Sequence, residues 1–149
     1  MPRAFIILCV TLLHHAAFAA PTSSTRGMVA SAHPAATLAG VAILDVGGNA
    51  ADAASAVAFA LAVVEPYSSG IGGGGFALVR HNSNIAYLDF RERAPAKSTQ
   101  DMFIGSKGPD FLRARDGVLG VAVPGAVAGY LELQSRFGKL SRAQMLAPA

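Results

Sequence analysis

The segment Ala50–Val64 constrains the fold more than any other part of the sequence. It is almost wholly small and apolar, and a helix of that character must be buried on nearly all sides. Asn49 and, three residues on, Asp52 form the pattern of a capping box at its start, and Pro66 is expected to end it. The composition, 52% hydrophobic and only 14% charged, agrees with deep burial.

Two more helices are predicted from spacing and from glycine. Residues 36–46 carry apolar residues at helical spacing, and Gly47-Gly48 ends that helix because glycine takes the left-handed conformation at little cost. Residues 125–136 form the other helix, after Pro124 and before Gly138. The residues placed in helical register are Leu38, Val41, Ala42 and Leu44 or Asp45 in the first helix and Val127, Tyr130, Leu131 and Gln134 in the second.

A β-hairpin is predicted between these helices. Residues 76–80 and 85–92 read as antiparallel strands joined by the polar turn 81–84. Strand alternation then divides the second strand into two faces. Ile85, Tyr87, Asp89 and Arg91 share one face, and Ala86, Leu88, Phe90 and Glu92 share the other.

The remaining segments are predicted from weaker signals. Residues 27–31 suggest a first strand, and Ser98 or Thr99 caps a short helical turn that reaches residue 103. Residues 105–117 read as a mobile polar loop, and residues 118–123 as an extended piece. Ser141 and Gln144 form a second capping box, whose helix has barely begun where the sequence stops, so we expect a fragment of a longer domain.

The first 19 residues have the features of a secretory signal peptide. Arg3 supplies the positive start, residues 4–13 are apolar, and Ala17-Phe18-Ala19 fits a cleavage site. This apolar core falls short of the ~20 residues that span a bilayer, so no stable membrane span is expected. We therefore predict a signal peptide at 1–19, a linker at 20–26 and a secreted or periplasmic mature chain without its one cysteine, Cys9.

The glycine run Gly72–Gly75 has three interpretations. It could cradle a phosphate, but it lacks the Gly-Lys-Ser/Thr ending of a P-loop and precedes a strand. It could let the chain pass close to a packed element, since no side chain intervenes. It could also bring the backbone close to a ligand. The structural interpretation is modestly favoured.

Arg91 is the candidate binding residue. Its guanidinium is a rigid fork of donors that matches a carboxylate, and it stands at a strand end just before Pro95. Spacing alone leaves open a clamp for a small anionic substrate or, as the commoner case, a salt bridge to Asp89 or Glu92.

Other site chemistry is not indicated. His33 and His81 lack the i, i+4 spacing of a helical metal pair, so no metal or cofactor is expected. No nucleophile stands beside an evident base, so no catalytic residue is assigned. The net charge is only +3 and its basic residues are scattered, which argues against a nucleic-acid partner.

From residue 27 onward, several blocks in order resemble the gamma-glutamyltranspeptidases, or glutathione hydrolases. They are Gly27–Ser31, Ile43-Leu44, Gly47–Ala53, Gly72–Phe76, Asp89–Glu92 with Ala94-Pro95, Asp101–Phe103, Val123–Gly125 and Ala147–Ala149. One such block is weak evidence, whereas the ordered set is strong.

The resemblance implies an α+β fold of the N-terminal nucleophile hydrolase type, an αββα sandwich of which only the N-terminal portion is present. Residues 27–149 correspond to the N-terminal part of the large subunit. In this family a precursor cuts itself, and the new N-terminal threonine of the small subunit attacks the gamma-glutamyl amide of glutathione. The arginine of the Phe-Arg-Glu motif, here Arg91, holds the glutamyl α-carboxylate.

The attacking threonine has no counterpart in this sequence, so the chain is expected to be inactive without its small subunit. An alternative is a cephalosporin (glutaryl) acylase-type relative with the same architecture. Another is a non-enzymatic exported fragment that uses only the binding half.

Overall fold

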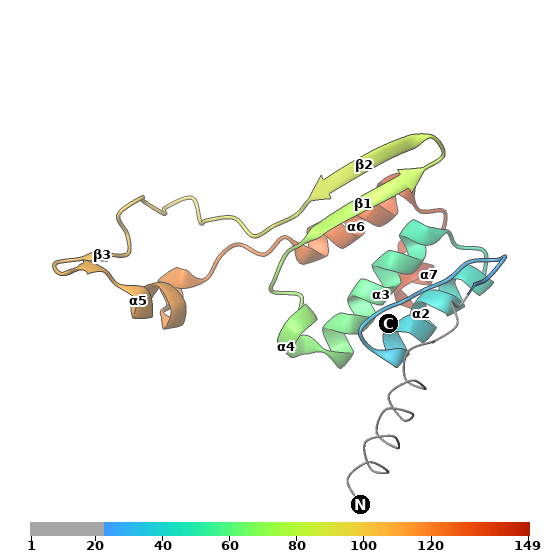
Figure 1. Cartoon of the computed structure of the whole chain (residues 1–149), viewed down its shortest axis with the longest axis horizontal. Helices are drawn as coiled ribbons and strands as arrows, with labels where there is room; N and C mark the ends of the chain where they lie inside the picture. The colour runs from blue at the N-terminus through green and yellow to red at the C-terminus, as the bar shows by residue number, and fades with distance from the viewer. Residues whose placement is uncertain (1–22) are drawn as a thin grey trace, which may run out of the picture.

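The computed structural model describes residues 23–149, in which helices pack on one side of a β-hairpin (Figure 1). The predicted signal peptide 1–19 lies outside the described residues, and so do residues 20–22 of the linker. None of the helices in residues 23–149 has the length and apolar character that a membrane span requires.

The buried helix predicted from the sequence is α3 (Ala50–Val64), and the helix before it is α2 (Pro34–Asp45). The capping box is confirmed: the Asn49 side chain accepts from the backbone N–H of Ala51 and Asp52, and Asp52 accepts from the Asn49 N–H. Gly47 has the positive φ of +90° expected of a helix-ending glycine. Pro66 ends α3 as predicted but also begins a further turn, α4 (Pro66–Ser69).

The faces of α2 differ from the prediction. Its buried residues are the small Ala36, Ala39 and Gly40 together with Ile43, whereas Leu38 is 68% exposed. A Cβ at Gly40 would lie 2.6 Å from a methyl group of Val57, so the two helices approach too closely for larger side chains. The apolar spacing identified the helix but not the side that it buries.

The hairpin consists of β1 (Phe76–His81) and β2 (Asn84–Asp89), paired antiparallel with Leu78 opposite Tyr87. Its turn is tighter than predicted, because Asn82 takes a left-handed φ of 56° and a two-residue connection suffices. The predicted alternation is confirmed: Leu88 is buried, whereas Ile85 and Tyr87 are exposed.

The inner face of the hairpin packs on α6 (Ala126–Phe137) and on the start of α3. The core there joins residues from all four elements. They are Ala51, Leu88 and Leu133, flanked by Ala77, Val79, Phe90 and Phe137. α7 (Arg142–Leu146) begins at the predicted capping box of Ser141 and Gln144 and buries Met145 against α3.

Residues 94–122 form an arm that extends away from the helices (Figure 1). Its base is closed by a backbone bridge between Arg93 and Val123. The arm contains β3 (Ile104–Gly105), β4 (Gly108–Pro109), α5 (Phe111–Asp116) and the 3₁₀ turn η1 (Val118–Gly120). The predictions of a loop at 105–117 and of an extended piece at 118–123 were therefore wrong in part, because Asp110 caps α5 by accepting from the Arg113 N–H.

Two short elements predicted from the sequence do not form. Residues 27–31 form no strand and pair with none within residues 23–149, and Val29 instead packs over Gly40 of α2. Residues 98–103 make separate turns rather than a helix, with hydrogen bonds from Met102 N–H to Thr99 and from Ile104 N–H to Asp101.

Candidate functional site

Arg91 lies just past the end of β2, between two fixed points of the backbone. On one side Gly75 and Phe90 exchange two backbone hydrogen bonds that continue the hairpin. On the other side Arg93 pairs with Val123. The Arg91 N–H donates to Oδ1 of Asp89 at 3.0 Å, so the backbone that carries the guanidinium is held at this position.

The glycine run makes this arrangement possible. A Cβ at Gly74 would lie 2.6 Å from the Phe90 carbonyl oxygen and 2.9 Å from the Cα of Arg91. The Gly73 carbonyl accepts from the N–H groups of Gly125 and Ala126, which ties the run to the start of α6. The favoured structural interpretation of the run therefore has direct support, since only glycine permits this approach.

The Arg91 guanidinium has two neighbours. Its Nε lies 3.1 Å from Oε2 of Glu92, so the salt bridge considered from the sequence is present, with Glu92 rather than Asp89 as the partner. Its Cζ lies 5.8 Å from the centre of the Phe76 ring. The Arg91 side chain is 62% exposed, whereas the Glu92 side chain is 30% exposed and its Oε2 is buried, so water reaches the guanidinium but not this carboxylate oxygen.

Glu92 borders a hollow of about 400 Å³ beneath the glycine run. The hollow is lined by residues of α4 and of the glycine run and by Tyr130 of α6. Within residues 23–149, Oε2 of Glu92 makes no hydrogen bond of good geometry. The end of the hairpin thus presents a cation and an anion side by side.

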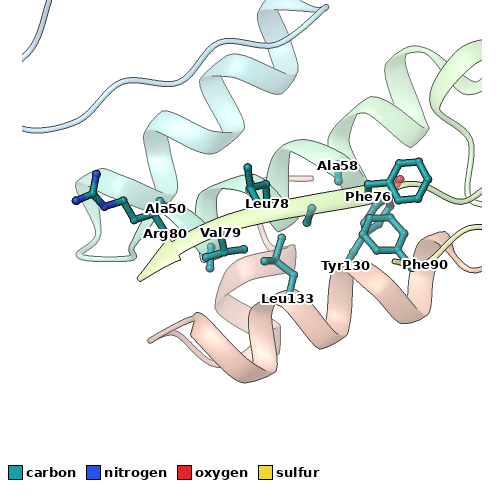
Figure 2. Close-up of a pocket in the computed structure, with 12 residues that line it drawn as sticks. Ala50, Ala58, Phe76, Leu78, Val79, Arg80, Phe90, Tyr130 and Leu133 are labelled. Atoms are coloured by element: carbon teal, nitrogen blue, oxygen red, sulfur yellow. The ribbon is translucent and has the colours of Figure 1, made fainter. Parts of the chain in front are cut away.

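A second groove, of about 440 Å³, runs along β1 (Figure 2). Alanines of α3 form one wall, and Leu133 points into it from α6. Phe76, Phe90 and Tyr130 gather at one end, near the candidate site, and burial raises the pKa of the Tyr130 hydroxyl. This groove offers an apolar surface with few polar groups.

The sequence did not indicate the aromatic residues beside Arg91. Phe76 and Tyr87 stack with ring centres 5.7 Å apart and 20° between their planes. The signal was available, because alternation places Tyr87 and Arg91 on one face, and the register pairs Phe76 with Asp89 of that face. His33 has a local role: its Nδ1 accepts from the Ala35 N–H and caps α2.

The chain is similar to known proteins along most of its length. Residues 36–149 match the family described as Gamma-glutamyltranspeptidase. The chain is 45% identical to the Glutathione hydrolase proenzyme of Escherichia coli over 131 residues, which are 87% of this chain and 23% of that protein. It is 44% identical to the Acylase ACY 1 proenzyme of Pseudomonas sp. (strain V22) over 139 residues, 87% of this chain and 25% of that protein.

A solved structure of Helicobacter pylori gamma-glutamyltranspeptidase matches with a TM-score of 0.82 at 41% identity, over 87% of this chain and 38% of that one. These matches define an α+β fold of the N-terminal nucleophile hydrolase class. The chain belongs to the gamma-glutamyltranspeptidase family. It spans about a quarter of the length of the curated relatives that it matches.

Proposed function

We propose that residues 27–149 are the N-terminal part of the large subunit of an exported gamma-glutamyltranspeptidase. The parent enzyme would cleave the gamma-glutamyl amide of glutathione and transfer the glutamyl group to water or to an amino acid. The attacking threonine would come from a small subunit of the same precursor. The proenzyme names of the relatives support this two-subunit arrangement.

The position of Arg91 carries the proposal. The printed contact of Glu92 is with Nε, at 3.1 Å, and the hydrogen bonds found within residues 23–149 include none from the two terminal guanidinium nitrogens. Those nitrogens form the edge that a carboxylate binds bidentately. The proposed role of Arg91 is to bind the α-carboxylate of the glutamyl donor at this edge.

A chimeric proenzyme tests this role, with residues 27–149 replacing the matching segment of the Escherichia coli relative. Arg91→Ala should raise KM for gamma-glutamyl-p-nitroanilide roughly 30- to 700-fold. Loss of the charge-assisted pair would weaken donor binding by about 2–4 kcal/mol, which corresponds to that range. Arg80→Ala is the matched control, since Arg80 is also an exposed arginine of the hairpin but lies at its other end. An inactive chimera, or an unchanged KM in Arg91→Ala, contradicts the proposed function.

The acylase relatives favour a second candidate, a glutaryl acylase-type enzyme. A glutaryl donor lacks the α-amino group, so the contacts that decide between the two donors would lie outside this chain. Sequencing the gene beyond codon 149 and assaying its complete product with both donors would separate the candidates. A Thr-led small subunit with a preference for the glutaryl donor supports the acylase.

The signal peptide at 1–19 and the secreted or periplasmic location are part of the same proposal. N-terminal sequencing of the exported chain should begin near Ala20. Recovery of the chain with Met1 at its start, in the cytoplasm, contradicts export. A non-enzymatic binding role would be supported if isothermal titration of the chain with glutathione gave saturable binding.

A further inference from the structure

Phe76 is placed where it can control the direction of the Arg91 side chain. It is the first residue of β1, paired with Asp89, and its ring lies 5.8 Å from the Arg91 Cζ. The ring is 54% exposed, so the core does not account for its position. The Phe76 ring is instead held by stacking on Tyr87, with ring centres 5.7 Å apart and 20° between the ring planes.

The guanidinium needs such a neighbour because Glu92 competes for it. Nε is 3.1 Å from the Glu92 carboxylate, and a long, mostly exposed arginine can rotate to give both terminal nitrogens to that carboxylate as well. The face of an aromatic ring attracts a guanidinium without using its N–H groups. A ring below the guanidinium therefore opposes this rotation and leaves the hydrogen-bonding edge open.

We propose that Phe76, supported by Tyr87, is a positioning residue that holds Arg91 ready for the carboxylate of an anionic donor. The inference rests on the proposed function of Arg91. Phe76 acts only on the orientation of the guanidinium, so it should affect donor binding and leave the chemical step unchanged.

The test compares variants of the chimeric proenzyme described above. Phe76→Leu removes the ring and keeps an apolar side chain, and it should raise KM for gamma-glutamyl-p-nitroanilide about three- to tenfold, with kcat within about twofold. Phe76→Tyr keeps the ring face and should restore KM. Leu112→Ala, at an exposed apolar residue of the arm, is the control for general loss of apolar contact and should leave KM unchanged.

The outcomes separate the inference from the proposed function. If Arg91→Ala raises KM and Phe76→Leu does not, the positioning role is wrong and the proposed function stands. If kcat and KM both change in Phe76→Leu and Phe76→Tyr does not restore them, Phe76 is only structural and the inference fails. If Phe76→Leu prevents processing, Tyr87→Leu decides: a raised KM at constant kcat supports the inference, and an unchanged KM overturns it. If Arg91→Ala itself has no effect, the proposed function fails first.

Discussion

At the scale of single residues, the Asp52 side chain accepts four hydrogen bonds within residues 23–149. It is fully buried and accepts from the backbone N–H groups of Asn49, Lys139 and Leu140 and from Nε2 of Gln134. Burial raises the pKa of this carboxyl, but the four hydrogen bonds outweigh burial, and the net pKa lies below the ordinary value. Asp52 therefore joins the start of α3 to the segment between α6 and α7.

Asp52→Asn should lower the free energy of unfolding by about 1–3 kcal/mol at pH 7, because an amide group replaces an acceptor among N–H donors. Because the pKa of Asp52 is lower in the folded state, its carboxylate stabilises the fold fully at pH values above the unfolded-state pKa of about 4. This stabilisation is lost as the pH falls through the folded-state pKa. Denaturant unfolding measured from pH 7 to pH 2 should show that the difference in free energy of unfolding between Asp52→Asn and wild type shrinks as the pH falls. A difference independent of pH contradicts this account, and Asp101→Asn, at an exposed aspartate, is the control.

At the scale of elements, the contact between α6 and β2 depends on a glycine. Gly129 is buried in α6, and a Cβ there would collide with the Phe90 ring. Phe90 meets Tyr130 edge-on at 5.7 Å, and Tyr130 meets Phe59 of α3 in the same way at 5.3 Å. These aromatic contacts thus connect α3, α6 and the residue that follows β2, directly before the candidate site.

Gly129→Ala should destabilise the chain by about 1–3 kcal/mol, although alanine is the better helix former by about 1 kcal/mol. The collision with Phe90 outweighs the gain in helix propensity. Thermal unfolding checks this, with Ala128→Ser at the exposed neighbouring position as the control, expected within about 0.5 kcal/mol. Adding Phe90→Leu should recover part of the loss, whereas strictly additive losses would exclude the proposed contact.

These elements also show what the sequence could predict. Caps and breakers such as Asn49, Gly47 and Gly138 are local signals, so the helices around α3 and the two faces of the hairpin were predicted correctly. The buried face of α2 was not, because Ala36, Ala39 and Gly40 are buried beside Ile43 while Leu38 is exposed. The close approaches at Gly40 and Gly129 involve residues distant in the sequence, which local signals do not reveal. Arg91 was predicted from its motif, and its role stays a prediction. Its contact with Phe76 follows only when the hairpin register is combined with the alternation along both strands, because spacing along one strand does not reveal it.

At the scale of the whole molecule, the two faces of the hairpin differ sharply. The inner face lies on α6 and α3 (Figure 1). The outer hairpin face carries four exposed apolar side chains. They are Phe76, Leu78, Ile85 and Tyr87, between 54% and 75% exposed. Arg91 follows the same alternation, so the proposed carboxylate clamp lies at one end of this apolar face. The proposed remainder of the proenzyme would then cover these apolar residues and, through the same contact, complete the site.

The chain by itself should therefore self-associate through the outer hairpin face. Large exposed apolar patches drive association, and burying each leucine or isoleucine contributes about 1.5–3 kcal/mol. Sedimentation velocity across a range of concentrations should show oligomers that Leu78→Thr with Ile85→Thr reduces, since threonine keeps the strand propensity while lowering apolar area. Leu112→Thr with Val118→Thr removes comparable exposed apolar groups from the arm and should leave association unchanged. If the unsubstituted chain is monomeric, or if the two double substitutions reduce association equally, the chain does not associate through the outer hairpin face.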